Sequence, residues 1–147
     1  MSAMQADGTL ILKLYELRRD PEFRAARRWF LERFHPVGAE DIVRVMVGGF
    51  DGSAPFRMVT TYWEMAAALV NRGAIDEALF QEANSEHVAV FAKLHPHLAE
   101  VRAAFREPGY LAQLERLVVR LPDAEGLMAR RRRLFERWRD QAATTAE

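Results

Sequence analysis

The sequence has no cysteine, only two lysines and no long apolar run. Without cysteine there can be no disulfide bridge, thiol nucleophile or thiolate metal site. No apolar run approaches the roughly 18 residues of a membrane-spanning helix, and the first residues lack the basic start and apolar stretch of a secretory signal. We therefore expect a cytoplasmic protein that does not use a membrane.

No charge of one sign dominates, because 21 basic residues balance 21 acidic ones. No overall field would draw the protein to nucleic acid or to anionic lipid. All basic residues except Lys13 and Lys93 are arginine, a bias that we attribute to a GC-rich genome rather than to phosphate binding. The length of 147 residues and the 50% hydrophobic content suit one domain with one core.

Apolar residues recur at helical spacing along most of the chain, and Asp20, Asp76 and Asp123 stand where helices begin. These patterns predict an all-α, single-domain bundle of about six or seven mostly antiparallel helices. We expect residues 1 to 8 to be disordered, residues 9 to 141 to form the helical domain and residues 142 to 147 to be a polar tail. Residues 39 to 48 could be helix or strand because of their β-branched side chains; we favour helix.

Residues 56 to 72 give the clearest helical pattern, which we place at the centre of the bundle, with Gly73 ending that helix. At 100° per residue Glu64 points away from the apolar face, so we expect it to meet solvent or a secondary interface. A second long helix, residues 86 to 105, should bend at Pro96. The apolar face of the first helix is predicted to contain Met58, Val59, Tyr62, Trp63, Met65, Ala66, Leu69 and Val70.

The histidines are the first candidates for metal binding or catalysis. Glu32 and His35 have the Glu-x-x-His spacing of di-iron bundles, but the second copy that such a site needs is missing. We therefore predict no metal, no cofactor and no catalytic set. The most promising ligand cleft would combine Tyr62 and Trp63 with Glu64 and His87, although a core role for these residues is the simpler interpretation.

The strongest charge feature is the run from Arg130 to Arg133 in the last predicted helix. Arg130, Arg133 and Arg137 would share one stripe, with Trp138 on the apolar side. Consecutive residues spread around a helix, and nearby acids dilute the charge. We therefore expect this surface to contact protein, within the bundle or in a dimer, and rank nucleic-acid binding below that.

The stretch from Phe56 through Trp63 to Asp76 resembles uncharacterised bacterial all-helical proteins classed as domains of unknown function, most strongly over residues 56 to 106. The resemblance implies a helical fold and a bacterial source, and it brings no activity, cofactor or catalytic residue. Helix faces without a convergent catalytic set favour a non-enzymatic interaction or regulatory module. We expect it to form a homo-oligomer, most simply a dimer, and no particular partner protein is indicated. The alternatives are a ligand-binding protein or enzyme that uses the cleft, and a nucleic-acid binder that uses the arginine-rich helix.

Overall fold

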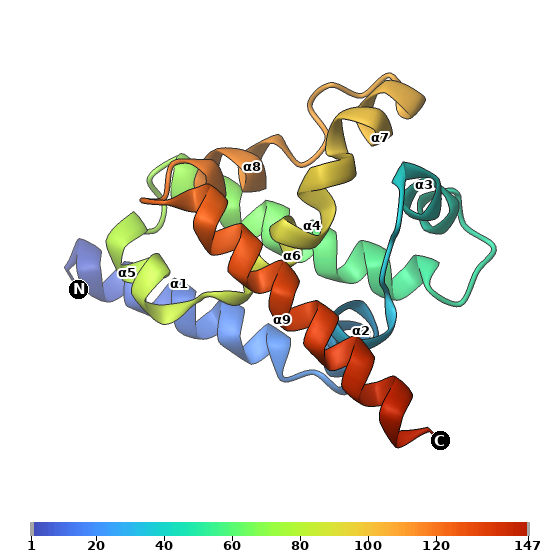
Figure 1. The fold of residues 1–147 in the computed structure, drawn as a ribbon. Coiled ribbons are helices and arrows are strands. Elements are labelled where there is room, and N and C mark those ends of the chain that lie inside the picture. Colours follow the sequence, from blue (N-terminus) through green and yellow to red (C-terminus); the bar gives the residue numbers. More distant parts are fainter. Residues whose placement is uncertain (1, 147) are drawn as a thin grey trace.

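The computed structural model describes residues 2 to 146, which are all-helical apart from short connections (Figure 1). Within this range α6 and α7 are joined by a 3₁₀ turn, η2, and a π-helical turn, η1, extends α2. Counted with these extensions, the described residues form eight helical segments rather than the six or seven expected. The elements are α1 (Ala3–Arg18), α2 (Pro21–Arg28), η1 (Trp29–Arg33), α3 (Ala39–Val47), α4 (Ser53–Asn71), α5 (Glu77–Ala83), α6 (Glu86–Leu94), η2 (His95–His97), α7 (Leu98–Phe105), α8 (Ala112–Val119) and α9 (Ala124–Thr145).

The first helix begins earlier than the sequence indicated. Ser2 and Gln5 form a capping box, in which the Gln5 N–H donates to Ser2 Oγ at 3.2 Å and the Ser2 N–H donates to Gln5 Oε1 at 2.8 Å. Residues 3 to 8, expected to be disordered, are therefore the first turns of α1. At the other end α9 continues to Thr145, into the segment expected to be a polar tail.

Helix caps explain where several elements start. Asp20 accepts the N–H groups of Glu22 and Phe23 at 2.9 and 3.2 Å, and Asp76 accepts that of Leu79 at 2.9 Å, as predicted. Asp123 is different: it occupies the cap position of α9 but makes no capping hydrogen bond. Its carboxylate lies 3.4 Å from Nη1 of Arg130 instead.

Residues 39 to 48, which could have been helix or strand, form a helix as favoured. This helix, α3, spans Ala39–Val47, and Gly48 and Gly49 end it with positive φ. Gly73 likewise has a φ of 82° after α4, as the C-terminal signal predicted. Pro96 lies in the 3₁₀ turn between α6 and α7, so the predicted bend is confirmed. Local signals in the sequence thus locate most helix ends.

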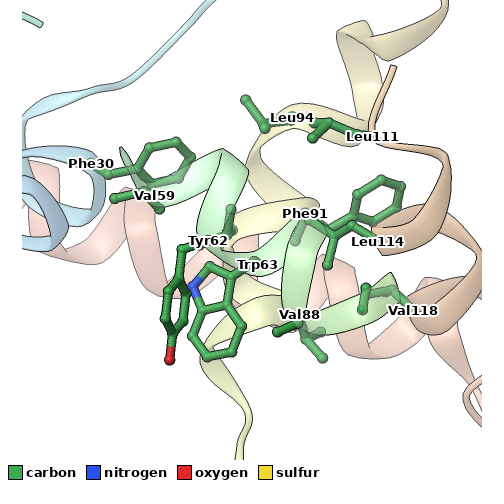
Figure 2. Packing of buried hydrophobic residues seen from close by; sticks show 14 of the residues in the cluster. Phe30, Val59, Tyr62, Trp63, Val88, Phe91, Leu94, Leu111, Leu114 and Val118 are labelled. Atoms are coloured by element: carbon green, nitrogen blue, oxygen red, sulfur yellow. The ribbon is translucent and has the colours of Figure 1, made fainter. Parts of the chain in front are cut away.

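The core surrounds α4, which packs against α2, α3, α5, α6 and α8 (Figures 1 and 2). The predicted apolar face was partly wrong: Met65 is exposed and Met58 and Leu69 are only partly buried, whereas Thr60 is buried. A helix with neighbours on most sides buries more than one stripe. The buried residues of α4 are Ser53, Phe56, Val59, Thr60, Tyr62, Trp63, Ala66, Ala67 and Val70.

The last helix, α9, lies across α6 and projects beyond the rest of the molecule at its C-terminal end (Figure 1). Met128 and Phe135 are its buried residues. Among residues 2 to 146, no helix has the length and apolar character needed to cross a membrane.

Candidate functional site

Three of the four residues predicted to line a cleft do come together, but inside the core. The rings of Tyr62 and Trp63 meet edge to face with centroids 4.8 Å apart (Figure 2). The centroids of Trp63 and His87 are 5.6 Å apart. Trp63 is 1% exposed and His87 is fully buried. These two side chains are therefore closed to solvent, and only Tyr62 borders a groove, beside Leu17 and Met65.

His87 is held as a neutral ring. Its Nε2 lies 2.8 Å from Oε1 of Gln81, and Phe80 and Trp63 cover its faces. Burial, together with the smaller effect of the positive charges of Arg18 and Arg131, lowers the pKa of His87 to about 4. At neutral pH this histidine is a hydrogen-bonded part of the core.

Glu64 lies at an interface between α4 and α8, which is one of the two positions that the helical wheel predicted. Its Oε1 accepts the N–H of Leu114 at 2.7 Å, and its Oε2 accepts the N–H of Gln113 at 3.3 Å. The carboxylate therefore caps the N-terminus of α8, which has no capping side chain of its own. Glu64 is half-buried and does not face His87, so the structure separates it from the predicted cleft.

A charged network lies beside the buried aromatic residues, and the sequence analysis missed it. Nε of Arg27 donates to both carboxylate oxygens of Glu86 at 2.9 Å, and Nη2 of Arg18 lies 3.5 Å from Oε2 of the same residue. The Arg18 guanidinium also lies over Trp63, with Cζ 5.2 Å from the ring centroid. The hydrogen bond to Glu86 raises the pKa of Arg27 above its ordinary value.

The same arginines border a hollow of about 340 Å³ at the junction of α1 and α2. Arg19 and Arg24 complete its basic lining, and Tyr15 is its aromatic side. We call it the arginine hollow. The sequence has five arginines between residues 18 and 28, but they are less closely spaced than those of the last helix and were not predicted to form a site.

The predicted interaction surface on α9 is exposed at Arg130, Arg133, Arg137 and Trp138. Arg130 pairs with Asp123 of its own helix start, whereas Arg133 and Arg137 make no ion pair within residues 2 to 146. Trp138 is 39% exposed, and its ring packs edge to face against Phe135 with centroids 5.8 Å apart. The stripe therefore lies along an exposed face of α9, without the predicted contact to acids of the middle helices.

Lys93 is also buried. Its Nζ donates to the carbonyl oxygens of Phe30 and Phe34 at 2.6 and 2.7 Å, and it lies 4.1 Å from the Phe135 ring centroid. Burial lowers the pKa of Lys93 to about 7. The ammonium binds carbonyl groups at the end of η1 and so ties that π-helical turn to α6 and α9.

Apolar side chains also gather on the outside of α1. Large apolar residues with at least 39% exposure are found at eleven positions of the described chain, and five of these lie on this one helix: Met4, Leu10, Leu12, Tyr15 and Leu17. Leu12 and Ile11 line an open groove of about 700 Å³ that Leu79 of α5 closes on the far side. We call this feature the α1 groove.

Among residues 2 to 146, no group of three His, Asp or Glu residues is placed to hold a metal ion. His35, from the incomplete Glu-x-x-His pattern, has its Nε2 2.9 Å from the carbonyl oxygen of Glu32.

A family model for a domain of unknown function, DUF4760, matches residues 3–121. The chain belongs to the DUF4760 family. The match includes the α1 groove and the arginine hollow, and it ends before α9. It confirms the resemblance noted for residues 56 to 106 and extends it to most of the chain. No curated protein and no solved structure matches the chain.

Proposed function

We propose that this DUF4760 protein is a non-enzymatic interaction module that forms a homodimer through the α1 groove. The observation that carries the proposal is that five of the exposed large apolar side chains of the described residues lie on α1, one of which, Leu12, lines the groove beside the partly buried Ile11. An apolar surface of this kind on a folded domain is typical of a protein contact. A 16-residue helix is about 24 Å long, which is enough for a side-by-side helix pair.

A second copy suits this surface better than a strongly charged partner. The helix has two acids, Asp7 and Glu16, and two bases, Lys13 and Arg18, so its charges cancel. Lys13 and Glu16 already pair with each other at 3.5 Å and are exposed. A neutral, apolar helix can face an identical helix across a two-fold axis without repulsion between like charges.

Gly8 supports the same arrangement. It lines the α1 groove, and a Cβ added there would meet nothing within 4 Å in the folded chain. Glycine inside a helix reduces helix stability by about 0.5–1 kcal/mol relative to alanine. A glycine that the monomer does not need for packing leaves room for a partner helix to approach closely.

The test is the oligomeric state of two matched variants. Leu12 and Val47 are 65% and 66% exposed, so Leu12→Glu and Val47→Glu add the same charge at equally exposed sites, of which only Leu12 lies in the groove. We expect the wild type and Val47→Glu to be dimers in sedimentation equilibrium and Leu12→Glu to be a monomer with an unchanged helical spectrum. The proposal would be contradicted if the wild type stays monomeric up to high concentration. It would also be contradicted if both substitutions convert the dimer to a monomer to the same extent.

The proposed setting is the cytoplasm of a bacterium. The resemblance of residues 56 to 106 to bacterial proteins supports the source, and a fold that needs no disulfide is compatible with a reducing compartment. Fractionation of cells that carry the native gene would test the proposed location. We expect the protein in the soluble fraction rather than with membranes.

A further inference from the structure

We propose that the arginine hollow binds a phosphate anion, either free or carried by a small organic molecule. Its basic lining is Arg18, Arg19, Arg24 and Arg27, drawn from the end of α1 and the start of α2. Only Glu86 forms ion pairs with any of them among the described residues. Four arginines line the hollow and one carboxylate pairs with two of them, so the lining itself is basic. The hollow has a volume of about 340 Å³, which is the size of a small-ligand site.

Two of the four arginines are already held in place. Arg27 binds Glu86 through Nε and Nη2, and Nη1 of Arg18 lies 3.4 Å from Oδ1 of Asn84. The side chain of Glu86 is 12% exposed, so this anchor is largely shielded from water. Arginines fixed in this way lose little conformational freedom when a ligand binds, and their planar donor groups match the oxygens of a phosphate.

The lining of the hollow also includes arginines that the protein does not use. Arg19 and Arg24 make no side-chain hydrogen bond or ion pair within the described chain. Both are exposed, so an anion with several oxygens can engage them together.

The helix dipoles do not explain why all four arginines lie at these positions. Arg18 and Arg19 stand at the C-terminal end of α1, where a cation is favoured by the helix dipole in any case. Arg24 stands near the N-terminal end of α2, where a cation gains nothing from the dipole. Its position among three other arginines is explained by a shared negatively charged ligand.

The probe is inorganic pyrophosphate, measured by isothermal titration calorimetry against sodium chloride of equal ionic strength. Arg19→Gln with Arg24→Gln removes the two arginines without protein partners, so the fold should be retained, which circular dichroism checks. Arg72→Gln with Arg116→Gln removes the same charge from exposed sites outside the hollow. We expect binding to the wild type, an affinity lower by about tenfold or more in the first double variant and near wild-type affinity in the second.

Two results would overturn the proposal. One is that the wild type does not bind pyrophosphate beyond the chloride control. The other is that both double variants weaken binding equally, because the attraction would then come from the overall charge rather than from this site.

A second titration distinguishes the two sources of phosphate. Tyr15 lines the hollow and is 55% exposed, so its ring is available for stacking by an organic group. If AMP binds more tightly than inorganic phosphate and Tyr15→Ala removes that difference, the ligand is an organic phosphate. If both bind equally and Tyr15→Ala changes neither, the ligand is the inorganic anion.

Discussion

Helices α1 and α4 are both rich in apolar residues, yet they are buried to very different extents. Nine residues of the 19-residue α4 are buried, whereas Leu14 is the one buried residue of the 16-residue α1. The difference follows from their neighbours: α4 packs against helices on most sides, while α1 contacts mainly α2 and α5. Apolar content alone therefore does not predict how much of a helix is buried, because the arrangement of the neighbouring helices decides it.

The largest difference between the two helices should appear on removing one large side chain from each. Trp63→Ala in α4 should lower the free energy of unfolding by about 3–5 kcal/mol, because it leaves a cavity in a closed core. Leu12→Ala in α1 should change it by less than about 0.5 kcal/mol at concentrations where the chain is monomeric. Urea denaturation of both variants measures this contrast, and similar losses at the two sites would show that α1 is more deeply packed than we describe.

The next prediction concerns the histidine that packs against α4. Its pKa is about 4 in the folded protein and near 6.5 in the unfolded chain, so the unfolded state binds more protons between these values. Stability should therefore fall as the pH is lowered from 6.5 to 4, with His87 contributing about 3 kcal/mol. The variant His87→Gln keeps a hydrogen-bonding side chain and does not titrate. Urea denaturation at several pH values should give a smaller loss for this variant, and equal pH dependence of the two proteins would contradict the buried neutral histidine.

A smaller effect is expected where α4 caps another helix. Glu64→Ala removes the acceptor for two N–H groups at the start of α8 and should lower stability by about 0.5–2 kcal/mol. Glu64→Gln keeps one acceptor oxygen and should lose less. Thermal denaturation of the two variants tests whether Glu64 caps α8. A loss of less than about 0.5 kcal/mol in both would show that Glu64 behaves as an ordinary solvent-facing residue.

The smallest expected change in stability is on α1, and it is an increase rather than a decrease. Gly8→Ala adds a methyl group that meets no atom in the folded chain, so it should stabilise the monomer by about 0.5–1 kcal/mol through helix propensity. The same methyl group would narrow the α1 groove and should weaken the proposed dimer. Melting at low concentration and sedimentation equilibrium at high concentration separate the two effects. A variant that is both more stable and equally dimeric would place the dimer contact elsewhere.

The candidate site was only partly predictable. Tyr62, Trp63 and His87 were grouped because their helices carry strong apolar patterns, and the simpler interpretation of those patterns, a core role, is the one that the burial of Trp63 and His87 supports. The arginine hollow escaped prediction because Glu86, which organises it, is 59 residues from Arg27 in the sequence. Spacing rules apply within one helix and carry no information about such a pair.

The sequence by itself determined where most helices begin and end. Caps such as Asp20 and Asp76, the glycine at position 73 and the proline at position 96 act on hydrogen bonds between residues a few positions apart, so their effect is visible without a fold. Only the tertiary structure decided which face of each helix is buried, which carboxylate caps α8 and which arginines share one hollow. Those outcomes depend on contacts between distant segments, and the free energy of burying a side chain is set by whatever packs against it.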